Sequence, residues 1–171
     1  DLLEIPFNAS FIPVLGDSTQ WLPSRICCLL TSPPFANNID YIRHTQLQLL
    51  WSGLAYDSRD LGYWRSLQLP ACQAAARSWK KMINDPEVIQ LINEMKPCYR
   101  RRYSVFLRQY LYYMRKHIEL LAERLEGPAW YTIGDSFLGG VYVPTHRILE
   151  KYVLEIGLKT GITRIDNRVS R

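Results

Sequence analysis

The sequence has few of the features that mark metal-binding or disulfide-bonded proteins. It holds four cysteines, but no two of them form a Cys-x-x-Cys pair. The three histidines are scattered and show no ligand spacing. These absences exclude a zinc pattern and a disulfide framework, so we assign no metal site. Reduced cysteines in a cytosolic protein are the simplest interpretation.

Membrane-directing segments are missing as well. No apolar run approaches the roughly 20 residues that a membrane span needs, and no basic segment followed by an apolar one opens the chain. We therefore expect no membrane partner. The chain begins at Asp1 and not at Met, which favours a piece of a longer protein.

What is present is an ordinary globular composition with a basic balance. The 171 residues are 47% apolar and 22% charged, which fits one domain with a sizeable core. The formal net charge is +5. Two interpretations remain open: simple solubility, or attraction to a polyanion such as nucleic acid.

The apolar pattern alternates between strand-like and helix-like segments. The run at 25–31 predicts a strand buried on both faces, and residues 57–69 read as a loop. The further predicted strands are 129–133 and 158–166, and the predicted helices are 38–54, 71–83, 86–96, 104–126 and 144–156. This order favours an α/β fold with a largely parallel sheet.

Two unusual loops follow predicted strands. Ser32–Phe35 follows the first strand and Gly134–Ser136 follows the second. Ligands of such sheets bind beyond the carboxyl ends of the strands. We therefore expect both loops to lie on one edge of the sheet.

The segment Thr31-Ser32-Pro33-Pro34-Phe35 has the parts that methylation of a base amino group requires. The base must leave the stack, at a cost of a few kcal/mol, and must then be held flat with its amine toward the methyl donor. An aromatic ring can stack on it, which contributes about 1–3 kcal/mol. Two prolines stiffen the turn and have no N–H of their own.

This segment resembles the (Ser/Asp/Asn)-Pro-Pro-(Tyr/Phe) motif of the DNA amino-methyltransferases. The serine form after Thr31 is more typical of cytosine-N4 than of adenine-N6 enzymes. Other stretches are similar to those that flank the motif in this family: Gly16–Ser18, Asn38–Arg43, Leu50–Leu54, Ile133–Ser136, Gly140–Thr145 and Glu155–Leu158.

The resemblance implies roles for the motif residues. Ser32 and the Pro33 carbonyl would accept hydrogen bonds from the target amine, Pro34 would hold the turn rigid, and Phe35 would stack on the flipped base. Asp17 would contact the cofactor, S-adenosylmethionine. The alternatives are a core aromatic for Phe35 and a turn-forming side chain for Asp17.

DNA contacts are assigned on the same grounds. Asn38, Tyr41 and Arg43 follow the motif and would face DNA, although Asn38 could instead cap a helix and the other two could be surface residues. Arg100, Arg101 and Arg102 are the best candidates for phosphate contacts in a helical insertion at about 55–128. The favoured alternative for this insertion is a helical cap over the sheet.

One central piece of the family is missing. Its members bind S-adenosylmethionine through a Phe-x-Gly-x-Gly turn, and the sequence contains none. The resemblance therefore implies a partial Rossmann-like methyltransferase fold, with residues 1–171 as one incomplete catalytic domain. Three explanations remain open: a fragment, a split enzyme with a second chain that carries the cofactor motif, or a degenerate relative.

The leading hypothesis is a DNA methyltransferase of a prokaryotic restriction–modification system, located in the cytoplasm with the nucleoid. It would methylate cytosine N4, or adenine N6 as the less favoured base. The second hypothesis is a methyltransferase-like module that binds nucleic acid or a subunit without catalysis. The third, methylation of RNA or protein, more usually involves Asn or Asp before the two prolines.

Overall fold

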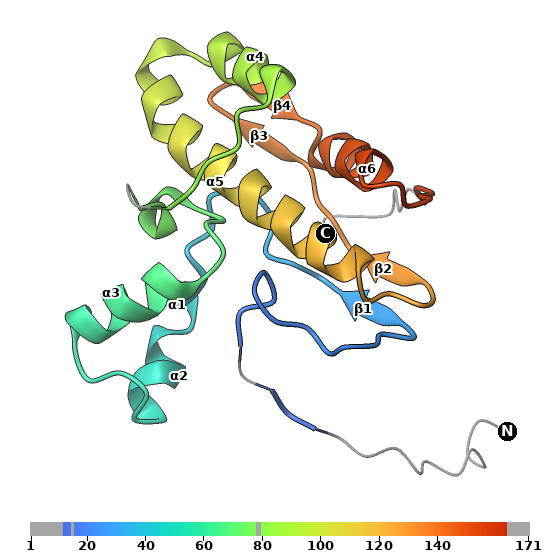
Figure 1. Cartoon of the computed structure of the whole chain (residues 1–171). Coiled ribbons are helices and arrows are strands. Elements are labelled where there is room, and N and C mark those ends of the chain that lie inside the picture. Colours follow the sequence, from blue (N-terminus) through green and yellow to red (C-terminus); the bar gives the residue numbers. More distant parts are fainter. Residues whose placement is uncertain (1–11, 15, 78–79, 164–171) are drawn as a thin grey trace, which may run out of the picture.

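The computed structural model describes residues 12–14, 16–77 and 80–163, and these form a mixed α/β structure (Figure 1). The described strands are β1 Leu29–Thr31, β2 Ala129–Tyr131, β3 Ser136–Leu138 and β4 Val141–Val143. The described helices are α1 Tyr41–His44, α2 Gln46–Trp51, α3 Ser58–Leu67, the 3₁₀ helix η1 Gln73–Ala75, α4 Pro86–Glu94, α5 Pro97–Ala122 and α6 Thr145–Glu155.

The strands form two separate pairs. β1 and β2 are parallel, with Leu29 opposite Ala129, whereas β3 and β4 are antiparallel, with Ser136 opposite Val143. The expectation of a largely parallel sheet is therefore wrong for the second pair. The reason lies at Gly139 and Gly140, whose positive φ angles of 59° and 89° turn the chain straight back into a hairpin.

The first strand is also shorter and less buried than its apolar sequence predicts. Leu29 and Ala129 pack near Leu121 at the C-terminal end of α5. Leu30 and Trp130 lie opposite each other on the other face and are 81% and 61% exposed. A strand buried on both faces was expected, but the described helices that pack on this pair cover one face.

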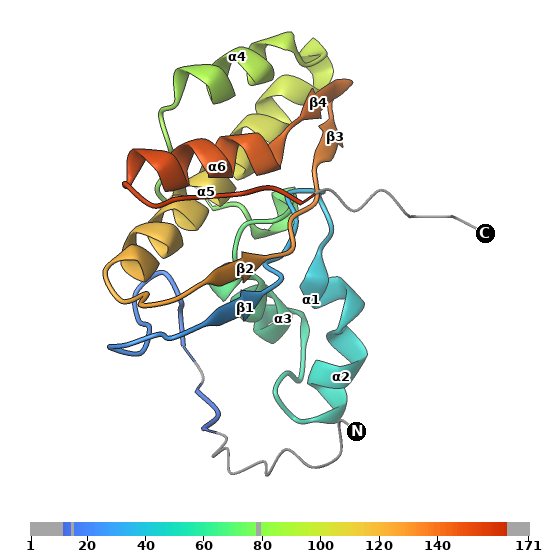
Figure 2. The ribbon, with the colours of Figure 1, turned by 90° about the vertical axis from the view of Figure 1, so that its right-hand side faces the viewer.

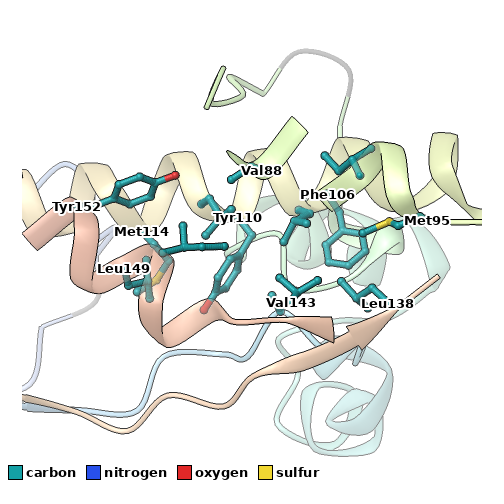
Figure 3. Close-up of a cluster of buried hydrophobic side chains, with 14 of the residues drawn as sticks. Val88, Met95, Phe106, Tyr110, Met114, Leu138, Val143, Leu149 and Tyr152 are labelled. Atoms are coloured by element: carbon teal, nitrogen blue, oxygen red, sulfur yellow. The ribbon is translucent and has the colours of Figure 1, made fainter. Parts of the chain in front are cut away.

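The main core lies along α5. Phe106, Tyr110 and Met114 recur on one side of this helix at spacings of four, as a buried helix face requires. Figure 3 shows Phe106 and Tyr110 beside Leu138 and Val143 of the hairpin. α4 and α6 pack on the same helix (Figure 2), so α5 is the axis of the body.

Local signals explain two of the differences from the predicted helices. The predicted loop at 57–69 is α3, because the Asp57 side chain accepts hydrogen bonds from the N–H groups of Arg59 and Asp60 and so caps a helix. α5 begins at Pro97, seven residues before its predicted start, because proline at the first helical position sacrifices no hydrogen bond.

The predicted helix at 71–83 is reduced to η1. Its backbone bonds elsewhere: the buried Gln109 side chain accepts from the N–H of Arg77 and donates to the carbonyls of Arg77 and Lys80. The Ile83 N–H donates to the carbonyl of Arg108. Contacts with α5 thus replace the helical hydrogen bonds of this segment.

Other predictions hold in part. The predicted helix at 38–54 is split into α1 and α2 at Thr45, and the three helices α1, α2 and α3 form a lobe beside the body (Figures 1 and 2). α6 ends near Gly157, whose φ is 90°. Residues 158–163 are not in a strand, and 164–166 lie outside the described residues. No helix within the described ranges combines the length and apolarity that a membrane crossing needs.

Candidate functional site

The two unusual loops meet beyond the carboxyl ends of β1 and β2, and we call this place the carboxyl rim (Ser32–Phe35 and Gly134–Ser136). The Thr132 N–H donates to the Thr31 carbonyl at 3.0 Å and so extends the parallel pairing. Two residues further on, Gly134 lies against the Phe35 ring, and a Cβ atom at Gly134 would be 2.8 Å from its Cδ2 atom. The prediction that both loops share one edge is confirmed.

The motif residues differ in exposure. Ser32 is exposed, while Pro33, Pro34 and Phe35 are half-buried and the next residue, Ala36, is fully buried. The serine hydroxyl is therefore open to a ligand while the remainder of the turn is anchored in the protein. Phe35 is supported on one side by Gly134 and is not part of the buried core cluster.

Two of the residues after the motif hold its loop in place. The Tyr41 hydroxyl accepts a hydrogen bond from the Phe35 N–H at 3.4 Å. Asn38 adopts a left-handed φ of 63°, its N–H donates to the Ala71 carbonyl, and its side-chain oxygen accepts from the Gln73 N–H. Both residues thus have structural contacts, and neither contact requires DNA.

Arg43 lies on the exposed side of α1. Together with Asn38, Asp40, His44 and Gln46, it lines a shallow hollow of about 480 Å³ beside the motif loop. The carboxylate of Asp40 forms an ion pair with Arg65 at 2.8 Å and also caps α1. The acid in the hollow is therefore compensated, which leaves Arg43 available for an anion.

The three arginines at the start of α5 point in different directions. Arg100 donates to the carbonyls of Asn93 and Met95 at the end of α4. Arg102 donates to the Gln73 side chain, and Gln73 in turn is bound to Asn38. Arg101 is exposed between them. The structure thus joins Arg102 to the motif loop through Gln73, while Arg100 belongs to the opposite flank of α5.

Asp17 forms the kind of turn that the alternative interpretation describes. Its carboxylate accepts hydrogen bonds from the Thr19 N–H, the Thr19 hydroxyl and the Gln20 amide. Burial would raise the pKa of Asp17, but these bonds, led by the Thr19 N–H, lower it below the ordinary value. The carbonyl of Ser18 lies 3.0 Å from His117 Nδ1, which anchors the turn. A cofactor contact by Asp17 stays a prediction.

A polar cluster that the sequence did not indicate lies next to the carboxyl rim. Asp135 accepts hydrogen bonds from the Tyr142 hydroxyl at 2.5 Å, from the His146 N–H at 3.1 Å and from His146 Nδ1 at 2.7 Å. Burial acts to raise the pKa of Asp135, but the bonds from Tyr142 and His146 outweigh it and lower this pKa. The residues come together because the β3–β4 hairpin folds back, so their sequence spacing carried no signal.

Comparisons with protein-family models, with curated proteins and with solved structures found no match to the chain. The site is therefore defined by its own residues: a Pro-Pro turn with an exposed serine and a supported aromatic ring, at the carboxyl end of a parallel strand.

Proposed function

We propose that the chain is the base-binding part of an S-adenosylmethionine-dependent DNA methyltransferase, with cytosine N4 favoured over adenine N6. One observation carries the proposal. The exposed Ser32 precedes a Pro-Pro turn at the end of β1, and the neighbouring loop supports Phe35 at Gly134. Its setting would be a prokaryotic restriction–modification system in the cytoplasm.

The parts of the turn match the two N–H groups of an exocyclic amine. The Ser32 hydroxyl and the Pro33 carbonyl are two acceptors on adjacent residues, and a proline cannot offer a competing N–H. Phe35 supplies a π face on which a flipped base can stack. The amine proton can leave after methyl transfer, so the site needs no strong base.

The described residues do not fit the cofactor as a whole. Gly139 and Gly140 form the hairpin turn and pack against Met95 and Lys96, where added Cβ atoms would lie 3.0 and 3.3 Å from side-chain atoms. These glycines are therefore no cofactor cradle. In the proposed partial Rossmann-like fold, the cofactor turn comes from polypeptide outside the described residues, either of the same protein or of a second chain.

The parallel strand pair supports the proposal that part of the domain lies outside the described residues. β1 pairs with β2 on one edge, and no other described strand pairs with its second edge. Parallel strands are normally buried on both faces, whereas Leu30 and Trp130 are open here. An unpaired edge with an uncovered apolar face is what an incomplete parallel sheet presents.

The second candidate function is a non-catalytic module that binds nucleic acid or a partner subunit. The missing cofactor turn is the observation that favours it. The two candidates differ in what Ser32 does, because a binding module has no use for a hydroxyl aimed at a target amine.

The test is the methylated-nucleoside content of DNA. The gene in its natural coding context is expressed in a methylation-free bacterial host, with wild-type Ser32 or with Ser32→Ala, and total DNA is hydrolysed for mass spectrometry. We expect N4-methylcytosine with the wild type and at least a roughly tenfold loss with Ser32→Ala, because an acceptor for the reacting amine is gone.

Ser58→Ala is the matched control, since it removes a serine hydroxyl from the exposed start of α3. Methylation that survives Ser32→Ala unchanged would refute the role of this side chain. A wild type that methylates no base would favour the binding module.

A further inference from the structure

A basic hollow of about 330 Å³ lies between α4 and α5, away from the motif loop. Its polar lining consists of three arginines, a serine and an asparagine over an isoleucine floor, and no carboxylate is part of it. The lining residues are Ile89, Ile92, Asn93, Arg100, Arg101, Ser104 and Arg108.

Two of the three arginines are held in position by backbone carbonyls. Arg100 donates to Asn93 and Met95, and Arg108 donates through Nε to the Ile83 carbonyl at 2.9 Å. Arg100, Ser104 and Arg108 follow one another at spacings of four, which places them in a row along α5. Each guanidinium has five N–H donors, so donors remain for a ligand after these bonds are made.

The arginines of the hollow differ in their charge partners from other arginines of the described structure. Arg25, Arg59, Arg65 and Arg115 form ion pairs with carboxylates. Within the described part of the chain, no ion pair is formed by the three arginines of the hollow. The first turn of α5 has no acidic residue, although the positive end of a helix dipole favours acids there. Arginines without acidic partners at the positive end of a helix lower the stability of the fold. A bound anion would relieve this repulsion.

We infer that the hollow binds a backbone phosphate of the DNA whose base enters the carboxyl rim. The choice of DNA rests on the proposed function, while the choice of a phosphate group rests on the arginines. Arg102 on α5 is joined to the motif loop, because it bonds to Gln73 and Gln73 bonds to Asn38. Arg101 is exposed on the same helix, and Arg100 lines the hollow. A strand that passes Arg102 next meets Arg101, which itself lines the hollow.

The experiment measures binding of a labelled DNA duplex by fluorescence anisotropy at several salt concentrations, without any cofactor. The variants are Arg101→Gln alone, which removes a side chain with no ion pair in the described structure, and Arg101→Gln with Arg108→Gln. The control is Arg25→Gln with Arg59→Gln, which removes the same charge from exposed ion pairs elsewhere. Thermal melting checks that each variant is folded.

We expect the slope of log K against log salt to become shallower by about 0.9, the value for one phosphate, in the double variant of the hollow. The control should keep the wild-type slope. An equal change in both would overturn the inference, because it would show only the effect of net charge. So would unchanged DNA binding in variants that lose affinity for inorganic pyrophosphate, because the phosphate would then belong to a small molecule.

The inference and the proposed function can fail separately. If the slope changes as expected but Ser32→Ala leaves methylation intact, the binding of a DNA phosphate by the hollow is supported and the catalytic role of Ser32 is refuted. If methylation depends on Ser32 but the slope does not change, the DNA path across α5 is wrong.

Discussion

The contact between Phe35 and Gly134 leaves no room for a side chain at position 134. The Phe35 ring belongs to the loop after β1 and Gly134 to the loop after β2, so a single close approach joins the two halves of the carboxyl rim. A glycine is therefore required at position 134 because a side chain would not fit. Its backbone conformation does not require glycine, since its φ angle is not positive.

Replacing Gly134 by alanine tests whether this contact sets the pose of the aromatic ring. The new Cβ atom would lie 2.8 Å from Phe35 Cδ2, so the ring must shift. We expect the free energy of unfolding to fall by about 1 kcal/mol. Under the proposed function, we expect methylation to fall about a hundredfold, as a 1 Å displacement of a positioning group can cause.

Methylated-nucleoside analysis and urea unfolding provide the two measurements. Gly161→Ala is the control, because nothing lies within 4 Å of a Cβ there, and it should match the wild type. Full methylation by Gly134→Ala would show that Phe35 need not be held in this pose.

At the scale of the elements, the sequence predicted those whose signals are local. The heptad-like spacing of Leu107, Leu111, Met114, Ile118 and Leu121 predicts α5, and Gly157 marks the end of α6. The adjacency of the two site loops followed from the parallel order of β1 and β2. These predictions need only hydrophobic periodicity, helix caps and the rule that the carboxyl ends of parallel strands lie at one edge of the sheet.

α3 and the early start of α5 were missed although their signals, the Asp57 cap and Pro97, are local. The other failures depend on partners that are distant in sequence. The segment 71–83 reads as a helix because of its alanines, but Gln109 on α5 takes its backbone groups. The exposure of Leu30 could not be predicted from an apolar run, since burial depends on what covers the strand. The cluster of Asp135, Tyr142 and His146 arises only after the hairpin has folded back.

Asp85 links two helices through one carboxylate. It caps α4 by accepting from the Glu87 N–H, and it also accepts from Lys151 at 2.9 Å and from Tyr152 at 3.1 Å on α6. Burial alone would raise the pKa of Asp85, but the bonds from Lys151, Glu87 and Tyr152 lower it. The folded state therefore favours the ionised carboxylate.

The lowered pKa gives a pH dependence with a definite sign. The unfolded chain binds the proton more readily, so the contribution of Asp85 is present above the ordinary value of about 4 and is lost as the pH falls through the lower folded value. Asp85→Asn should cost about 2 kcal/mol at pH 7 and much less at the acid end.

Urea unfolding of wild type and variant at pH 7 and in acid measures this difference. Glu94→Gln is the control, since Glu94 is exposed and bonds only to Gln90 in the described structure. A difference between wild type and Asp85→Asn that does not shrink in acid would mean that packing, not the charge of Asp85, links the helices.

At the scale of the whole molecule, the strand pair is covered on one face only. Leu30 and Trp130 stand together on the open face, and Phe137 and Tyr142 form a second exposed pair on the hairpin. Adjacent large apolar side chains in the open commonly mark a surface that another polypeptide covers. This is consistent with the proposed incomplete domain.

Polar substitutions on this face should change the solution behaviour of the isolated chain and not its stability. We expect Leu30→Ser with Trp130→Thr to reduce self-association in sedimentation velocity and to reduce binding of an apolar dye. The free energy of unfolding should change by less than about 0.5 kcal/mol, since both side chains are largely exposed.

Leu154→Ser is the control, because Leu154 is an exposed leucine on α6, away from this pair. An equal effect of the control would mean that general surface apolarity, and not this face, governs association.

The pairing of β1 with β2 has a consequence for how the chain is made. One hundred residues separate Leu29 from its partner Ala129. At ribosomal speeds of about 5–20 residues per second, roughly 5–20 s pass between the synthesis of β1 and the synthesis of its partner strand. During that interval its apolar residues have no strand to pair with, while α5 is still being made. The nascent chain is thus open to chaperones, and to aggregation, at the strand that directly precedes the Ser-Pro-Pro turn.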